Sequence, residues 1–181
     1  MRFRGEKRME QTIQIRYAEQ ADVPEIMKIM TTASRLVEDA KWYSMDDEAY
    51  VRRHIDQEGF VLKALIDKKT AGFLLVRYPK DAKDNLGEYL NLTKQESLMV
   101  AHMESAAVLP EYTGRGIQRQ LMSAGEDIVL QQGYRYLMGT AHPENRYSVN
   151  NFLKLGYKIL LETEKYGGLP RYVFCKEMNG Q

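Results

Sequence analysis

The chain of 181 residues contains a single cysteine, Cys175, so an internal disulfide bond is excluded. A fold without disulfides needs no oxidising compartment. Cys175 ends an apolar run that begins at Tyr172, where we expect a buried, inert thiol rather than a reactive one. The sequence also lacks His, Cys, Asp and Glu residues at the spacing of a zinc site, so we expect no metal.

Long apolar runs and an excess of one charge are absent as well. No stretch approaches the roughly 20 apolar residues of a membrane-spanning helix, and the basic residues 1–10 lack the apolar part of a signal peptide. The net charge of +1 gives no reason to expect a nucleic-acid or membrane partner. We therefore expect a cytoplasmic protein, with a flexible tail at residues 1–10 and a single domain at residues 11–178.

What the chain does have is an ordinary globular composition, 44% hydrophobic and 28% charged, with clear hydrophobic periodicity. Strands come first as a meander and then alternate with helices, which favours a mixed sheet with helices on its faces. The polar stretch 79–97 is expected to be irregular, closing in a short helix, and to be either a lid or plain surface. The predicted strands are 13–17, 60–66, 72–76, 103–108, 136–138, 157–161 and 171–174; the predicted helices are about 22–37, 46–58, 117–128 and 148–155.

The most informative stretch is residues 108–118, where a strand ends, a turn holds two glycines and a helix begins. Amides at a helix start have no intrahelical partner, and the helix dipole adds positive potential there. Gly114 and Gly116 let a diphosphate approach the main chain, and Arg115 can add a charged contact. The dinucleotide fingerprint is excluded because Arg119 replaces its third glycine, and the chain has no Walker tripeptide. Another class of phosphate loop remains, beside the alternative of a purely structural turn.

Three stretches together resemble one family. Val108-x-Pro110-Glu111-Tyr112-x-Gly114-Arg115-Gly116-Ile117 resembles motif A of the GNAT superfamily, the Gcn-five-related N-acetyltransferases. Asn145-x-x-Ser148-x-x-Asn151-Phe152-x-x-x-Gly156-Tyr157 resembles its motif B, and residues 15–26 are similar to its usual first strand and helix. The resemblance extends from about Ile13 to Lys176. It implies the α/β (mixed α+β) GNAT acyltransferase fold: a central mixed, mostly antiparallel sheet flanked by helices, with splayed strands at the cofactor cleft.

The function that this resemblance implies is an N-acetyltransferase. Such an enzyme transfers an acetyl group from acetyl-CoA to a primary amine by direct attack in a ternary complex. The acceptor stays open between a small molecule and a peptide amine, and a homodimer is an option that the family raises. A second enzymatic alternative is an acyltransferase that uses a longer acyl-CoA as its donor. The alternative from another class is a catalytically weak sensor or interaction module that binds CoA or acyl-CoA.

The resemblance implies cofactor-binding roles for the residues of this chain that match the family motifs. It assigns the pyrophosphate to the backbone of residues 113–118 and the pantetheine amides to the backbone of Val108 and Leu109. Asn145 would bond the pantetheine arm from the other side or serve as a plain helix cap. The implied set is Val108, Leu109, Thr113, Gly114, Arg115, Gly116, Ile117, Gln118, Asn145, Ser148 and Phe152.

The chain departs from the family at three of these positions. Thr113 stands where the family commonly has Arg or Gln, and Gln118 where it has Gly or Ala. Backbone amides bind the phosphates, so we expect this binding to survive. Phe152 replaces the tyrosine that, in many members, protonates the leaving CoA thiolate. Another group or water would then serve as the acid, or none is needed, because thiols ionise at a pKa of about 8.5.

Acid–base candidates lie on the strand before the loop. An alkyl amine is mostly protonated at neutral pH, so a base or proton relay is expected. In the family this strand often supplies a glutamate base, which makes Glu104 the first candidate. His102 is the second, on the same side of a regular strand. A surface carboxylate or an ion pair with Arg16 are the alternatives for Glu104. Candidates for the acid are Tyr147, Tyr166 and Tyr172.

The acceptor wall is expected to be aromatic. In the family it is formed near the first helical pair and near the turn at residues 166–172, and aromatic rings there suit an amine. Core packing is the alternative for the same rings. Asp46 and Asp47 could attract a cationic acceptor or cap a helix. The expected substrate-binding residues are Trp42, Tyr43, Tyr166 and Tyr172.

Overall fold

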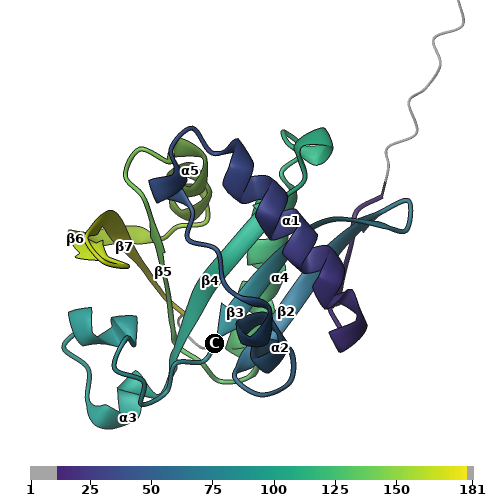
Figure 1. The fold of residues 1–181 in the computed structure, drawn as a ribbon. Helices are drawn as coiled ribbons and strands as arrows, with labels where there is room; N and C mark the ends of the chain where they lie inside the picture. Colours follow the sequence, from purple (N-terminus) through teal and green to yellow (C-terminus); the bar gives the residue numbers. More distant parts are fainter. Residues whose placement is uncertain (1–11, 179–181) are drawn as a thin grey trace, which may run out of the picture.

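The computed structural model describes residues 12–178, so the tail predicted at residues 1–10 lies outside the described residues. Seven strands form one sheet in the order β1-β2-β3-β4-β5-β7-β6 (Figure 1). Only the β4–β5 pair is parallel, so the predicted mixed, mostly antiparallel sheet is confirmed. The strands are β1 (Gln14–Tyr17), β2 (Gly59–Ile66), β3 (Lys69–Arg77), β4 (Val100–Val108), β5 (Tyr136–Ala141), β6 (Lys158–Lys165) and β7 (Leu169–Glu177).

Helices connect the strands in the predicted order. The short helix expected at the end of segment 79–97 is also present, with the capping box of Thr93 and Glu96 at its start. None of the helices among residues 12–178 is long and apolar enough to cross a membrane. The α-helices are α1 (Val23–Leu36), α2 (Glu48–Asp56), α3 (Lys94–Ser97), α4 (Ile117–Gln131) and α5 (Arg146–Lys154); the 3-10 turns are η1 (Gln20–Asp22), η2 (Ala40–Trp42), η3 (Leu86–Tyr89) and η4 (Pro110–Tyr112).

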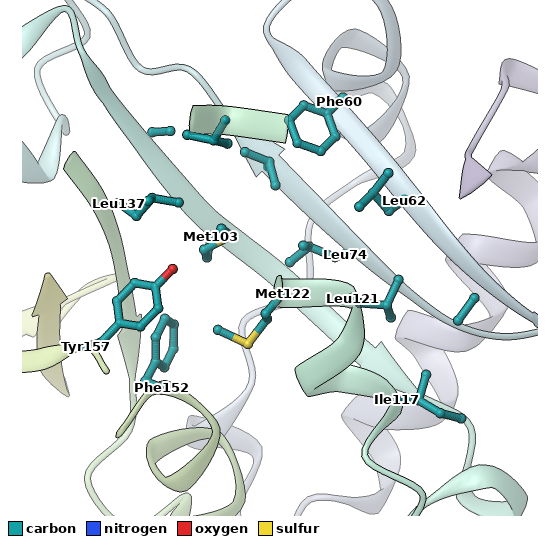
Figure 2. Packing of buried hydrophobic residues seen from close by; sticks show 14 of the residues in the cluster. Phe60, Leu62, Leu74, Met103, Ile117, Leu121, Met122, Leu137, Phe152 and Tyr157 are labelled. Carbon is teal, nitrogen blue, oxygen red and sulfur yellow. The ribbon is translucent and has the colours of Figure 1, made fainter. Parts of the chain in front are cut away.

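Both faces of the sheet are covered by helices. Figure 1 shows α1 and α2 on one face and α4 on the other. On the α4 face, Leu121 and Met122 pack with Leu74, Met103 and Phe152 in the largest core cluster (Figure 2). On the α1–α2 face, α1 packs its buried apolar side against alternate residues of β2 and β3. Alternate residues of each strand therefore point to different cores, as the period of a strand requires.

Segment 79–97 covers the rest of the α1–α2 face. Leu86 of η3 packs with Val100 of β4, Tyr136 of β5 and Cys175 of β7 in a third buried cluster. The thiol of Cys175 is buried, as predicted, and burial raises its pKa to about 11. The segment is thus packed on the sheet, and its place beside β4 brings it close to the predicted catalytic strand.

Two irregularities interrupt the pairing of β4. β4 pairs with β5 over only three residues, Val100 to His102, and the two strands then diverge (Figure 1). On its other side, Ser105 pairs with Leu75 and Met103 with Val76, so Glu104 is an extra residue in a β-bulge. The bulge leaves Glu104 and Ser105 on the same α1–α2 face, since they meet Tyr50 and Tyr43 respectively.

Candidate active site

A cleft opens through the sheet where β4 and β5 separate. It is lined by β4 residues 103–106, by β5 residues 140–141, by the first turns of α4 and α5, and by the loop at residues 42–44. We call it the central cleft. A side pocket beneath segment 79–97 shares Met103, Glu104, Thr140 and Tyr166 with it. The shared residues place Glu104 on the wall between the two hollows, whose linings together include residues on both faces of the sheet.

The glycine turn lies directly before the first turn of α4, whose Gln118 lines the cleft. Gly114 and Gly116 have φ values of 77° and 71°, in the left-handed region that favours glycine. Gly116 is the N-cap residue of α4 and provides no side chain to cap it. The first helical bond runs from Gln120 N to Gly116 O, so the amides of residues 117–119 have no intrahelical partner. Thr113 differs, because its amide and its hydroxyl both donate to Pro110 O.

The edge of β4 facing the cleft presents main-chain groups. Leu109 N donates to Ala71 O at 2.8 Å, so this amide is already paired on the β3 side. Because successive residues of a strand direct their amides to opposite edges, Val108 directs its N–H and C=O toward the gap. Ala106, two residues earlier, does the same and lines the cleft. The main chain available for a bound chain is therefore that of Val108 and Ala106 rather than that of Leu109.

Helix α5 forms the opposite wall. Asn145 accepts a hydrogen bond from Ser148 N, so it caps α5, and both residues also line the cleft. Phe152 lies one turn further on, stacked on Phe174 with ring centroids 4.4 Å apart. Its ring tip lies against β5 at Gly139, where a Cβ atom would come within 2.6 Å of Phe152 Cζ. The helix-cap and cofactor-facing interpretations of Asn145 are thus compatible.

Gln118 is the one residue of the predicted loop whose side chain enters the central cleft. The side chain is buried, with 6% of the residue exposed. The sequence singled it out only as a departure from the family pattern. Ile117 beside it is buried in the core, so its contribution to the loop is its amide.

Glu104 is held by donors on both carboxylate oxygens. Tyr50 OH of α2 donates to Oε1 at 2.9 Å, and His102 Nδ1 lies 3.3 Å from Oε2. Arg77 of β3 lies 4.0 Å from Oε1. Burial opposes ionisation of this carboxyl, but the contacts with His102, Arg77 and Tyr50 outweigh it and hold the pKa of Glu104 below its usual value. The side chain is neither an exposed carboxylate nor a partner of Arg16, which bonds Gln14 instead.

Asp46 is a second carboxyl in this region. Asp47, not Asp46, caps α2, since Asp47 Oδ1 accepts from Tyr50 N at 2.7 Å. Burial raises the pKa of Asp46 to about 7, and the charges of Glu104 and Asp47 add to the shift while Arg77 opposes it. The two neighbouring aspartates thus differ in role: Asp47 caps α2, whereas Asp46 has a pKa near neutral pH.

Aromatic side chains border the cleft where the acceptor wall is expected. Tyr43 OH is 3.2 Å from Ser105 Oγ, and burial raises the pKa of Tyr43 to about 12. Trp42 lines the cleft and stacks on His142, with ring centroids 6.1 Å apart. Tyr166 also lines the cleft, and its OH is 3.3 Å from Thr140 Oγ1. Three of the four expected acceptor residues therefore lie together, although the loop and the turn that carry them are far apart in sequence.

Two predicted residues lie elsewhere. Tyr147 is 49% exposed and lines neither hollow, and Tyr172 packs at the edge of the main core. The sequence patterns also gave no sign of Arg171. Its guanidinium is buried and donates to Lys41 O at 2.8 Å, and it lies over the Tyr166 ring at 5.3 Å. A lone arginine in a strand gives no signal of such contacts; only the fold shows that Arg171 links η2 to the turn that carries Tyr166.

Among residues 12–178, no group of three or more His, Cys, Asp and Glu side chains is placed to hold a metal ion. The lining of the cleft includes a carboxylate, tyrosines and main-chain groups of β4. A nucleophile entering from the acceptor side would meet Glu104, and a long ligand entering from the α4 side would meet free main-chain groups of β4.

The raised pKa of Asp46 predicts a pH-dependent effect of Asp46→Asn on stability. As pH rises from the ordinary aspartate value to about 7, the native protein keeps a proton that the unfolded chain has released, so this group lowers wild-type stability over that range. Asparagine avoids the loss. We expect Tm to rise by about 3 °C at pH 8 and by less at pH 5 in thermal unfolding. Asp81→Asn, at an exposed aspartate, is the control; equal shifts at both pH values for Asp46→Asn would contradict the assignment.

Comparison with known proteins agrees with this geometry. The model of the acetyltransferase (GNAT) family matches residues 23–157. A Salmonella typhimurium acetyltransferase solved with its cofactor acetyl-CoA is similar in structure, with a TM-score of 0.70, 19% identity, and 94% of this chain and 96% of that one covered. The Escherichia coli ribosomal-protein-S18-alanine N-acetyltransferase is similar with a TM-score of 0.69, 16% identity, and coverage of 94% and 97%.

A GNAT-family acetyltransferase from Streptococcus pneumoniae gives a TM-score of 0.70 at 17% identity, covering 93% of this chain and all of that one. At these identities the structural likeness establishes the fold. Among curated proteins, none matches the sequence. The family model spans most of the chain and includes both the glycine turn and α5. The chain is therefore a member of the GNAT family, an N-acetyltransferase that uses acetyl-CoA.

Proposed function

We propose that this enzyme acetylates a primary amine by direct attack, with both substrates bound at once and Glu104 as the group that receives the amine. The observation that carries the proposal is the position of Glu104. It lies in the bulge of β4, between the cleft that opens toward α4 and the side pocket that opens on the other face. An acyl donor and an amine can then approach this point from opposite faces of the sheet.

The residues present fit acetyl-CoA. The left-handed glycines and the unpaired amides at the start of α4 suit its pyrophosphate, and Gly114 has no atom near the position of a Cβ. The free main-chain groups of Val108 and Ala106 suit the amides of its pantetheine arm. Asn145 and Ser148 border the arm from α5, and Gln118 from α4. When bound, acetyl-CoA supplies the thioester carbon that the amine attacks.

Glu104 orients an alkylammonium acceptor and takes up its proton, directly or through water. Because its pKa is held low, the carboxylate is charged at neutral pH and attracts the cation before the proton leaves. A main-chain N–H on the free edge of β4 stabilises the negative charge that develops on the carbonyl oxygen. Asp46 adds a second carboxyl near the acceptor path, and Tyr43 and Trp42 add aromatic surface.

Tyr166 takes the place of the missing motif-B tyrosine as proton donor to the leaving thiolate. Of the three tyrosines considered from the sequence, it is the one that lines the cleft. Desolvation raises the pKa of its phenol, with the Thr140 hydrogen bond opposing, so the proton stays on Tyr166 at neutral pH. Its backbone has a left-handed φ of 52° and its ring lies against Arg171, while 55% of the residue remains exposed.

The pyrophosphate site is tested by Gly116→Glu, which places a negative side chain in the loop. Gly133→Glu is the matched control, because Gly133 also has a left-handed φ of 84° but lies just beyond the other end of α4. We expect calorimetry to show that Gly116→Glu weakens acetyl-CoA binding at least about 100-fold, through charge repulsion and loss of close approach. Gly133→Glu should bind normally. Equal affinity of the two variants would refute this placement.

The role of Glu104 is tested by Glu104→Gln. Thiol release from acetyl-CoA is first measured across a panel of polyamines, amino acids, antibiotic amines and peptides to find an acceptor. With that acceptor, we expect kcat/KM to fall about 100-fold or more, because a neutral amide neither attracts the ammonium nor accepts its proton. Acetyl-CoA affinity should stay unchanged. An unaltered kcat/KM across the pH range would remove the role assigned to Glu104.

The proton donor is tested by Tyr166→Phe, which keeps the ring over Arg171 and removes only the hydroxyl. We expect kcat to fall about 10-fold or more with little change in acetyl-CoA affinity, since the lost proton affects departure of the thiolate. Tyr147→Phe, at the exposed tyrosine of α5, is the control and should behave as the wild type. Matching rates for all three proteins would remove the role assigned to Tyr166.

A further inference from the structure

His102 is buried, with 2% of its surface exposed, and both of its ring nitrogens have partners. Nδ1 is 3.3 Å from Glu104 Oε2. Nε2 is 3.0 Å from the backbone N of Leu86, the first residue of η3 in segment 79–97. Because both ring nitrogens of His102 have protein partners, neither is free to contact a substrate. His102 therefore has a different role from that of a base that takes a proton from the substrate.

The contact with Leu86 decides where the imidazole carries its proton. A backbone amide can only donate, so Nε2 must be the unprotonated acceptor. The proton of the ring then sits on Nδ1, which directs it at Glu104 Oε2. With the opposite tautomer, the lone pair of His102 Nδ1 would face a lone pair of Glu104 Oε2. At the other nitrogen, the Nε2–H group would face the N–H group of Leu86. One main-chain amide of segment 79–97 therefore sets the direction of the hydrogen bond to Glu104.

We infer that His102 is a positioning residue for Glu104, and that segment 79–97 acts through it. Leu86 N–H fixes the tautomer of His102, and His102 Nδ1–H fixes the carboxylate of Glu104, which lines both hollows. The inference rests on the proposed role of Glu104. It assigns segment 79–97, which the sequence left between a lid and plain surface, a part in catalysis through a hydrogen-bond relay from its backbone.

Other elements supply the rest of the Glu104 environment. Tyr50 and His54 face it from α2, Arg77 from β3, Asp46 from the loop before α2, and Tyr166 from the turn between β6 and β7. Asp84 of segment 79–97 forms two hydrogen bonds with Arg77 and also lies near His102. None of these groups forms a hydrogen bond with His102. The tautomer of His102 can therefore be changed by a substitution at Leu86 while these groups stay in place.

A backbone substitution isolates the relay. Leu86→Pro removes the donor N–H at the first position of η3, where proline is compatible with a helical turn. Asn85 before it is already extended, with φ −61° and ψ 116°, as a residue preceding proline should be. Leu86→Ala is the matched control, because it loses most of the same buried side chain but keeps the amide. Thermal unfolding of both variants shows whether they are comparably folded.

The first readout needs no substrate. Nitrogen-15 NMR of the imidazoles should show His102 as the Nδ1–H tautomer in the wild type and in Leu86→Ala, and a loss of that state in Leu86→Pro. Carbon-13 titration of the Glu104 carboxyl should give a higher pKa in Leu86→Pro, since a donor to the carboxylate is lost. An Nε2–H tautomer in the wild type would overturn the inference at once.

The second readout is a double-mutant cycle on kcat/KM. We expect His102→Leu to lower kcat/KM about 10-fold, the scale of a lost hydrogen bond to a charged group, and His102→Gln to lose less because its amide can still donate. In the Glu104→Gln background, His102→Leu should cause little further loss. If the two losses multiply instead, His102 acts independently of Glu104 and the inference is wrong. If Glu104→Gln alone is without effect, the proposed function fails rather than this relay.

Discussion

The site depends on one break in hydrogen bonding, the separation of β4 from β5 after three residue pairs. A parallel pair that continued to the end of β4 would use the main-chain groups of Ala106 and Val108 in the sheet. The divergence instead leaves them directed at a gap, and the gap connects the two faces. A buried, unpaired strand edge would be costly in a closed core, so it is tolerable only where a ligand or water can pair with it.

The bulge at Glu104 places a carboxylate at that gap. A regular strand would place residues 103 and 105 on one face and 104 on the other, whereas the extra residue puts Glu104 and Ser105 together toward α2. Burial works against a charged carboxylate there, and donors from α2, β3 and β4 offset the cost. The carboxylate can then remain ionised while partly shielded from solvent, where its interaction with any cation is stronger than in bulk water.

The sequence predicted the element order, the glycine turn and the α5 wall, because each leaves a local signature: periodicity, positive-φ glycines and a helix cap. It also placed Glu104 and His102 on one side of a strand. It did not predict that His102 is enclosed by the backbone of Leu86, that Arg171 reaches Lys41 O, or that Gln118 is buried in the cleft. These depend on residues brought together across 16 to 130 positions, for which a single sequence carries no pattern.

Phe152 shows how the site accommodates a change in one of its walls. Its ring is stacked on Phe174, meets Tyr157 edge-on at 5.0 Å and lies where a side chain at Gly139 would be. The position thus serves the core, and the Phe152 ring has no proton to donate. Tyr166 approaches the same cleft from the other wall, anchored by Thr140 and Arg171. Because Arg171 also donates a hydrogen bond to Lys41 O in η2, one side chain links the proposed proton donor Tyr166 to the segment that carries Trp42 and Tyr43.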